Sequence, residues 1–255
     1  MKDKLQNRIS NWLKEYIENN NLETFVIGVS GGIDSAVTST LCAMTGKRTI
    51  VLTMPIHQNQ NETDRGLKHI SWLKENYSNV EDLHIDLTDS YEDLKNNIPV
   101  QFQTNLSLAN TRARIRMSTL YLIAGGSNGI VAGTGNKIED FGVGFFTKYG
   151  DGGVDISPIA DLMKSEVYQL GREIGVIEDI LNARPTDGLW DDGRTDEDQL
   201  GVSYDELEWA MEHYNSDFKP ISLNDRKKHI LEVYNKHRNA NMHKMVDIPI
   251  YKESK

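Results

Sequence analysis

The sequence contains a single cysteine, six prolines and no long hydrophobic run. Cys42 has no partner for an internal disulfide or for a paired-cysteine metal or redox site, and we expect it on a buried helix face. No apolar run approaches the roughly 20 residues that a membrane helix requires. The first 20 residues carry a charge every few positions, which excludes the apolar core of a secretory signal. We therefore predict a cytoplasmic protein that does not enter a membrane.

Basic residues are scarce relative to acidic ones. The chain has 28 Lys and Arg against 38 Asp and Glu, which gives a formal net charge of −10 and a pI near 5.2. Such a surface repels a polyanion, so we expect no nucleic-acid partner. Small anions such as nucleotides remain compatible, because local donors and metal ions hold them.

Metal-binding patterns are also missing. The seven histidines form no HExxH or paired-ligand motif, and the acidic residues between 191 and 198 do not follow the order of an EF-hand loop. We expect neither a zinc site nor an EF-hand calcium site.

Short apolar segments rich in β-branched residues alternate with segments whose apolar residues recur at helical spacing. The predicted strands are residues 24–29, 49–53, 83–87 and 129–132. The predicted helices are residues 9–17, 36–44, 62–77, 106–125, 164–174, 203–214 and 222–236. Strands separated by helices of this length predict an α/β fold with a doubly wound, Rossmann-like parallel sheet, followed by a helical C-terminal part.

The length of the chain suits one large α/β domain, so we predict a single domain over residues 1–255. Residues 183–201 form a long polar stretch between two helices. Stretches of this length in compact domains are usually lids or disordered segments, and we predict an active-site lid here.

A glycine pair follows the first predicted strand, in the segment Ser30-Gly31-Gly32-Ile33-Asp34-Ser35. Two glycines allow a sharp turn that brings successive N–H groups within reach of an anion, and the following helix points its positive end at the same place. Asp34 suits this position if it shares Mg²⁺ with phosphate oxygens. The alternative is an ordinary turn in which Ser and Asp cap the helix. Neither GxxxxGK[ST] nor GxGxxG occurs at this strand.

The segment SGGIDS resembles the pyrophosphate loop of the N-type ATP pyrophosphatases, which include GMP synthetases and tRNA-modifying enzymes. Three further segments, 110–117 (NTRARIRM), 133–140 (GTGNKIED) and 146–155 (FTKYGDGGVD), are similar in order and spacing to the NAD synthetases. Residues 185–186 and 194–201 continue the similarity, which runs from about residue 26 to residue 204.

This resemblance implies an adenine nucleotide alpha hydrolase-like fold and a set of site residues. Expected at ATP and pyrophosphate are Gly28, Ser30, Gly31, Gly32, Asp34, Ser35, Thr134, Lys164 and Thr186. Expected at deamido-NAD are Arg114, Lys148, Asp151 and Asp155. Asp34 and Glu139 are expected to hold Mg²⁺, and Asp151 and Lys164 to take part in catalysis, whereas Asp140 is expected to be a helix cap. For each charged residue the alternative is a solvated helix or turn position.

Three arginines alternate along the helix predicted at residues 106–125. Arg112, Arg114 and Arg116 fan over roughly 200° of a helix, so they cannot all serve one ligand. The resemblance favours Arg114.

The activity that the resemblance implies is ATP-dependent amidation of deamido-NAD by ammonia through an acyl adenylate, with release of AMP and pyrophosphate. The chain is too short for an additional amidase domain, so free ammonia is the expected nitrogen source. A homodimer with the Arg114 helix near its interface is also implied. The alternatives are another ATP pyrophosphatase and a non-catalytic nucleotide-binding module of the same fold.

Two features depart from the family pattern. Gly135-Asn136-Lys137 replaces an acidic, histidine-bearing turn of some members, which leaves nucleobase or ribose contacts there open. Residues 242–245 lack the more basic ending common in the family.

Overall fold

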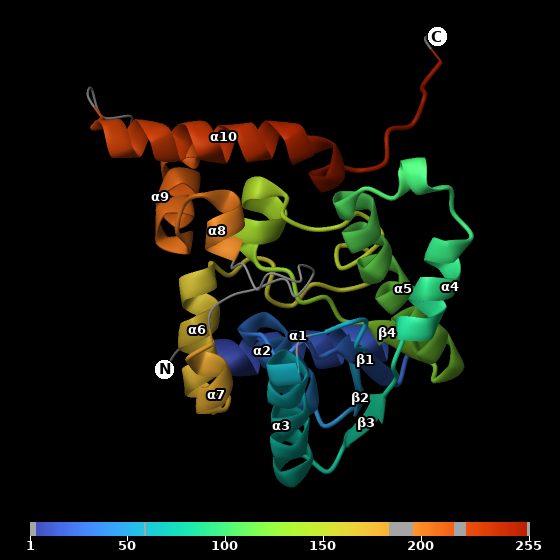
Figure 1. Cartoon of the computed structure of the whole chain (residues 1–255). Coiled ribbons are helices and arrows are strands. Elements are labelled where there is room, and N and C mark those ends of the chain that lie inside the picture. Colours follow the sequence, from blue (N-terminus) through green and yellow to red (C-terminus); the bar gives the residue numbers. More distant parts are fainter. Residues whose placement is uncertain (1–3, 59, 184–195, 217–222, 254–255) are drawn as a thin grey trace.

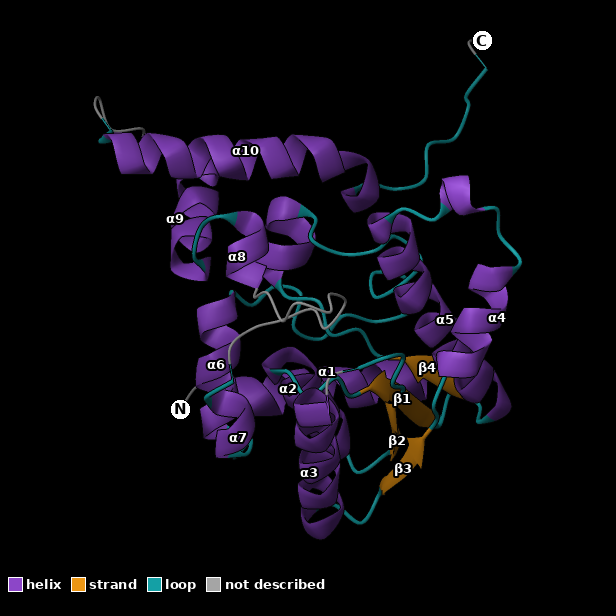
Figure 2. Cartoon of the chain, viewed as in Figure 1, coloured by secondary structure: helices purple, strands orange, loops and turns teal. Residues whose placement is uncertain are grey.

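The computed structural model describes residues 4–58, 60–183, 196–216 and 223–253. Its sheet has four parallel strands, β1 (Thr24–Gly28), β2 (Arg48–Thr53), β3 (Val80–His84) and β4 (Gly129–Val131), in the order β3-β2-β1-β4 (Figures 1 and 2). In the register of the sheet, Phe25 of β1 lies opposite Thr49 of β2 and Ile130 of β4. The predicted parallel sheet is confirmed.

Helices cover both faces of this sheet because β1 is apolar on both sides. Phe25 and Ile27 pack on one face against α1 (Leu5–Asn19), α2 (Ile33–Met44) and α6 (Lys164–Glu173). Val26 packs on the other face against α4 (Thr88–Asn96) and α5 (Asn105–Gly126). The helix α3 (Gln60–Asn76) covers β2 on the α2 side. The fold is therefore doubly wound, and Cys42 is buried on α2 as predicted.

The C-terminal part builds a second apolar core from helices. The remaining elements are η1 (Val100–Phe102), the π-helical turn η2 (Lys137–Val143), α7 (Glu178–Leu181), α8 (Asp196–Leu200), α9 (Tyr204–Asn215) and α10 (Asp225–Met245). Leu207 of α9, Tyr234 of α10 and Ile138 of η2 are fully buried in this core. The long helix α10 lies across the top of Figure 1, away from the sheet.

Two predicted elements differ from the structure, and several short elements have no predicted counterpart. β3 comprises Val80–His84 rather than residues 83–87, because it is an edge strand whose last four residues are exposed. Two of these residues form ion pairs, Arg48–Glu81 and Lys74–Asp82, so the strand has no apolar signature. The short helix α4, which has no predicted counterpart, buries only Tyr91. Finally, α10 continues to Met245, well past the predicted end at residue 236.

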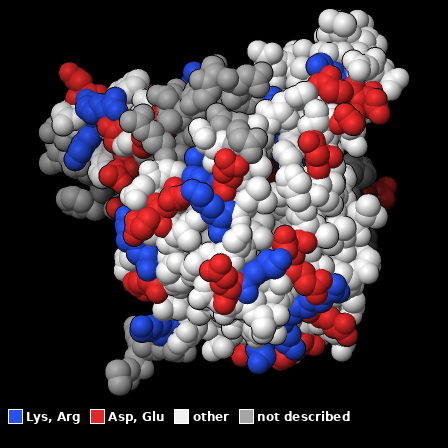
Figure 3. Space-filling view, turned by 60° about the horizontal axis from the view of Figure 1, so that its bottom comes forward, with Lys and Arg blue, Asp and Glu red and all other residues white. Residues whose placement is uncertain are grey.

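None of the helices within the described ranges has the length and apolarity that crossing a bilayer would require. Acidic and basic side chains are interspersed over the face of the molecule shown in Figure 3.

Candidate active site

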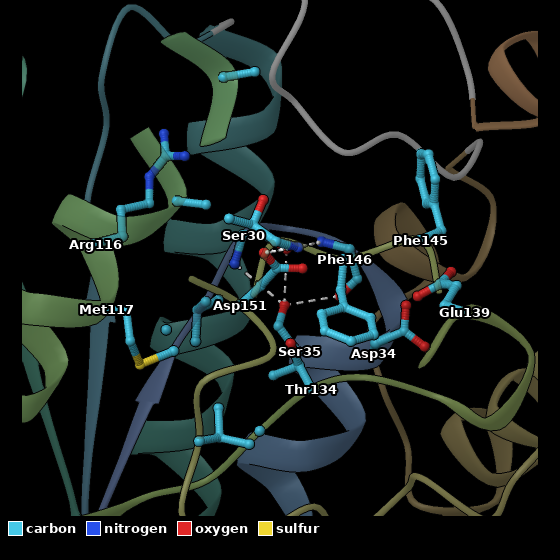
Figure 4. A pocket seen from close by; sticks show the side chains of 18 of the residues that line it. Ser30, Asp34, Ser35, Arg116, Met117, Thr134, Glu139, Phe145, Phe146 and Asp151 are labelled. Carbon is cyan, nitrogen blue, oxygen red and sulfur yellow. Dashed lines mark hydrogen bonds between the residues drawn. The ribbon is translucent and has the colours of Figure 1, made fainter. Parts of the chain in front are cut away.

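A cavity of about 800 Å³ lies at the carboxyl ends of β1, β2 and β4. Its walls come from the loop after β1, the buried side of α5, the segment 133–151 and the last turns of α10. This is the edge of a doubly wound sheet at which ligands are expected to bind. The sequence-predicted residues that line it are Gly28, Ser30, Gly31, Gly32, Asp34, Ser35, Arg114, Thr134, Glu139, Lys148, Asp151 and Lys164. Of these, Figure 4 labels Ser30, Asp34, Ser35, Thr134, Glu139 and Asp151.

The glycine-containing loop is held in a tight turn by its two serines. The Oγ atoms of Ser30 and Ser35 lie 3.2 Å apart, and Ser30 N donates to Ser35 Oγ at 3.2 Å (Figure 4). Gly31 has a φ of +86°, and a Cβ atom there would overlap the carbonyl oxygen of Glu62. Only glycine combines this backbone conformation with this close approach.

The N-terminus of α2 is not capped by a side chain. Its N-cap residue is Gly32, with no side-chain hydrogen bond to the first turn, so the alternative of Ser and Asp as capping residues is wrong. Asp34 instead directs its carboxylate to Lys164 and Asn136. Uncapped amides at a helix N-terminus form an anion site, because the helix dipole and the N–H donors act together.

Lys164 connects the two predicted metal ligands. Its Nζ atom lies 2.6 Å from Oδ2 of Asp34 and 2.9 Å from Oε1 of Glu139, and its side chain is only 4% exposed. Tyr204 donates its hydroxyl to the same Glu139 oxygen at 2.6 Å. The alternative of a solvated lysine is therefore wrong, and three chain-distant residues form one buried charge network.

The charges in this network influence one another. Burial opposes the charge of Lys164, but Asp34 and Glu139 outweigh it and raise the pKa of the ammonium group, which stays protonated. Burial likewise opposes the charge of Glu139, yet Lys164 keeps the pKa of this carboxyl below its ordinary value. Burial raises the pKa of Asp34. Two buried carboxylates share one cation, so a further positive charge would stabilise the site.

The donor set at Asp34 and Glu139 fits Mg²⁺. The carboxylates of Asp34 and Glu139 lie 2.6 Å and 2.9 Å from the same Nζ atom of Lys164, so they converge on one point of the cavity wall. The same part of the chain holds no group of three or more His, Cys, Asp or Glu side chains arranged for a metal ion. A pair of carboxylates completed by substrate phosphates and water is the usual Mg²⁺ environment, so these two residues could hold the ion with a bound nucleotide.

The three arginines of α5 separate as the helical spacing predicts. Arg114 and Arg116 line the cavity, whereas Arg112 stacks 5.8 Å from the ring centre of Tyr91. Arg114 donates from Nε to the carbonyl oxygen of Lys148 at 3.2 Å. Arg116 is not among the predicted site residues, and its guanidinium is anchored to Met54 O at 2.9 Å.

The segment containing Lys148 and Asp151 folds back on itself beside α5. Asp151 accepts a hydrogen bond from the backbone N–H of Thr147 at 3.0 Å, and burial raises the pKa of its carboxyl to about 6. Lys148 donates to the carbonyl oxygen of His243 at 3.2 Å. The site therefore places the carboxyl group of Asp151 and the amino group of Lys148 in the same cavity.

Two predicted residues do not join this set. Asp155 is not among the cavity-lining residues, since its carboxylate accepts from Tyr121 Oη at 2.9 Å and from Val131 N at 2.8 Å. Thr186 lies outside the described residues. The predicted lid, residues 183–201, also lies largely outside them, but Gln199 of α8 lines the cavity.

The last turns of α10 also line the cavity and were not predicted to do so. His237, Asn241, His243 and Lys244 contribute to its wall. Lys244 donates to the carbonyl oxygen of Phe146 at 2.6 Å. The one sequence signal was the continued helical pattern beyond residue 236, with basic residues near its end.

Comparison with known proteins gives consistent matches over nearly the whole chain. A sequence model of the family described as NAD synthase matches residues 5–248. The NH(3)-dependent NAD(+) synthetase of Alkaliphilus metalliredigens (strain QYMF) is 39% identical over 210 residues, which are 80% of this chain and 84% of that protein.

Solved structures agree with this result. The NMN synthetase of Francisella tularensis is 34% identical, with a TM-score of 0.86 and coverage of 98% of both chains. The NH3-dependent NAD synthetase of Campylobacter jejuni, solved with a nitrate ion, is 25% identical, with a TM-score of 0.77 and coverage of 97% of this chain and 98% of that one. The predicted adenine nucleotide alpha hydrolase-like fold is confirmed.

Proposed function

The chain belongs to the NAD synthase family, and we propose that it uses ATP to convert the nicotinate carboxylate of deamido-NAD to the amide with ammonia. The observation that carries this proposal is the buried set of Lys164, Asp34 and Glu139 beside an uncapped helix N-terminus. The N–H groups at the start of α2 can bind phosphate oxygens, and the two carboxylates can bind a cation that neutralises them. Arg114, Lys148 and Asp151 lie in the same cavity and supply the charges that a second, carboxylate-bearing substrate needs.

In the first step a carboxylate oxygen of the substrate forms a bond to the α-phosphorus of ATP, and the bond between this phosphorus and the bridging oxygen breaks. The N–H groups at the start of α2 and the hydroxyls of Ser30 and Ser35 receive the departing pyrophosphate. Lys164 orients the carboxylates of Asp34 and Glu139. Mg²⁺, held by these two carboxylates, would neutralise charge on the phosphates.

In the second step ammonia forms a bond to the carbonyl carbon of the acyl adenylate, and AMP leaves with the electron pair of the broken C–O bond. Asp151 holds the ammonium ion that supplies ammonia, since a carboxyl with a pKa of about 6 is ionised above neutrality. Ammonium loses one proton before it attacks and its nitrogen loses a second as the amide forms, and both protons pass to the solvent.

A homodimer would fit the surface of α5. Val100 and Phe102 just before this helix are 81% and 63% exposed, and Leu106 in its first turn is 63% exposed. Exposed apolar side chains close together in the chain favour a protein interface. Light scattering at several concentrations tests this part of the proposal. The net charge of −10 and the single cysteine support the further expectation of a cytoplasmic enzyme without a nucleic-acid partner.

The decisive experiment incubates the purified protein with ATP, Mg²⁺, ammonium and deamido-NAD and measures NAD and AMP by chromatography. Equimolar NAD and AMP are expected, with no NAD when ammonium is omitted. Replacing ammonium by glutamine distinguishes the nitrogen source. Without any AMP the chain would be a nucleotide-binding module rather than an enzyme, and AMP formed only with another acceptor would indicate a different ATP pyrophosphatase.

A mononucleotide substrate is the second candidate, because the Francisella tularensis structure with 98% coverage is called an NMN synthetase. Supplying deamido-NAD and nicotinic acid mononucleotide together, and comparing the initial rates of NAD and NMN formation, decides between the two. A higher rate of NMN formation would replace the dinucleotide in our proposal.

A further inference from the structure

The helix α3 packs directly on the phosphate loop through two glycines. A Cβ atom on Gly66 would lie 3.5 Å from both Gly31 N and Val29 O, and one on Gly31 would lie 3.1 Å from Gly66 N. The backbones of the loop and of α3 are therefore in contact, with no side chain between them. The residue before Gly66 therefore lies beside the phosphate loop.

That residue is Arg65. Its Nε atom lies 3.4 Å from the carbonyl oxygen of Gly31 with hydrogen-bond geometry, and the side chain lines the cavity next to Gly31 and Gly32. No other hydrogen bond or ion pair of this guanidinium is found within the described ranges, so its two terminal amino groups have no partner there. Nε of Arg65 is thus held by a hydrogen bond, and its two Nη atoms are available to bind a ligand.

The charge balance at the loop gives this arginine a role. Pyrophosphate departs with several negative charges, but the nearby Lys164 is already shared between Asp34 and Glu139. The loop itself contributes hydroxyls and N–H groups, which are neutral. A guanidinium with two free donors matches phosphate oxygens in charge and in geometry.

We propose that Arg65 binds the β- and γ-phosphates of ATP and holds the pyrophosphate as it leaves. This assignment rests on the proposed function, in which the loop receives that pyrophosphate. It adds a cation from α3 to a site otherwise built from the loop, α2 and α6. The hydrogen bond from Nε to Gly31 O restricts the side chain before the ligand binds. Binding of the phosphates by the two Nη atoms therefore costs less conformational entropy.

Calorimetric binding of inorganic pyrophosphate and of AMP, each with Mg²⁺, tests the proposal in the whole chain. Arg65→Ala is expected to raise the dissociation constant for pyrophosphate roughly 10- to 100-fold, as for loss of charge-assisted hydrogen bonds. The constant for AMP, which lacks these phosphates, should change less than about twofold. Arg65→Lys, which keeps the charge but not the fork, should fall between Arg65→Ala and the wild type.

Lys74→Ala is the matched control, because Lys74 lies on the same helix but pairs with Asp82 on the surface. Pyrophosphate binding unchanged in Arg65→Ala would overturn the proposal, and so would an equal loss of pyrophosphate and AMP binding, which indicates a structural role. The assay requires no turnover. A protein that makes no NAD yet loses pyrophosphate binding in Arg65→Ala would refute the proposed function and leave the role of Arg65 in place.

Discussion

Gly144 lies against Asn241 of α10 with no room for a side chain between them. A Cβ atom on Gly144 would lie 2.5 Å from Cβ of Asn241 and 2.5 Å from Cε of Met245. Asn241 donates to the carbonyl oxygen of Val143 at 2.9 Å, and Arg238 donates to that of Gly142 at 3.0 Å. The end of α10 is therefore fastened to the segment that leads into Lys148 and Asp151.

This contact predicts that Gly144→Ala destabilises the protein by about 2–4 kcal/mol, the sum of left-handed backbone strain at φ +65° and overpacking against α10. Urea unfolding measures the change. Gly46→Ala is the control, because Gly46 has a similar φ of +73° but open space within 4 Å of the position that a Cβ atom would take. Equal losses in the two variants would show that the α10 contact contributes nothing.

Replacing the two proposed metal ligands should slow the first step strongly. Asp34→Asn and Glu139→Gln are each expected to lower the rate of AMP formation by at least about 100-fold, and a chelator should do the same to the wild type. Asp34→Asn should also raise the Mg²⁺ concentration needed for half-maximal rate. Glu81→Gln removes an exposed carboxylate paired with Arg48 and should leave the rate unchanged. An unaltered Mg²⁺ requirement in both variants would contradict the assignment.

The separation of the arginines on α5 predicts different effects at adjacent positions. Arg114→Ala is expected to raise the KM for deamido-NAD by roughly 10-fold or more, because its guanidinium lines the cavity. Arg112→Ala should change this KM by less than about twofold, since Arg112 packs on Tyr91 outside the cavity. Steady-state kinetics with saturating ATP gives both values. The reverse order of effects would show that the wrong helix face had been assigned.

Asp140 makes stability depend on pH. Burial, with the charges of Glu139 and Asp151, raises the pKa of this carboxyl from an ordinary value of 3.8 to about 8. Between these two values the folded state binds more protons than the unfolded state, so stability falls as the pH rises from about 4 to about 8. Asp140→Asn cannot titrate and should be more stable than the wild type at pH 8, by on the order of 2 kcal/mol, with a smaller gain at pH 5.

Thermal unfolding in metal-free buffer at these two pH values measures the effect. Asp161→Asn is the control, since the Asp161 side chain is 95% exposed and pairs with Lys137 only on the surface, so its removal should change stability little. A gain from Asp140→Asn that is the same at pH 5 and pH 8 would mean that this carboxyl does not titrate in the window.

The sequence was most informative where the signal is local. Residues 24–35 combine a buried strand, a glycine turn and a helix start within one short segment, and the structure has each of these where the pattern predicts it. The buried strands β1 and β2 were found for the same reason. β3 was misplaced because an edge strand that is exposed along most of its length lacks an apolar run.

Long-range contacts were harder to predict. Nothing near Arg65 in the sequence indicates that Gly66 lies against Gly31, and nothing near Lys244 indicates that it reaches Phe146. The apolar residues of α10 are buried against α9, so their spacing in the sequence does not indicate that the end of this helix lines the cavity. The resemblance placed Asp34 and Glu139 at one cation and Lys164 near the phosphates, but the ion pairs of Lys164 with both carboxylates were not predicted. Its expectation that Asp155 contacts the dinucleotide stays a prediction.

The reach of α10 back to the segment 141–148 sets the order in which a newly made chain becomes competent. A ribosome releases the loop at Ser30 long before it adds Asn241 and Lys244, which complete the wall of the cavity. A nascent chain therefore lacks one wall of the cavity until α10 has been synthesised. Enzyme activity thus reports on molecules in which this helix has docked, because a chain that ended before residue 237 would lack His237, Asn241 and Lys244 in the wall of the cavity.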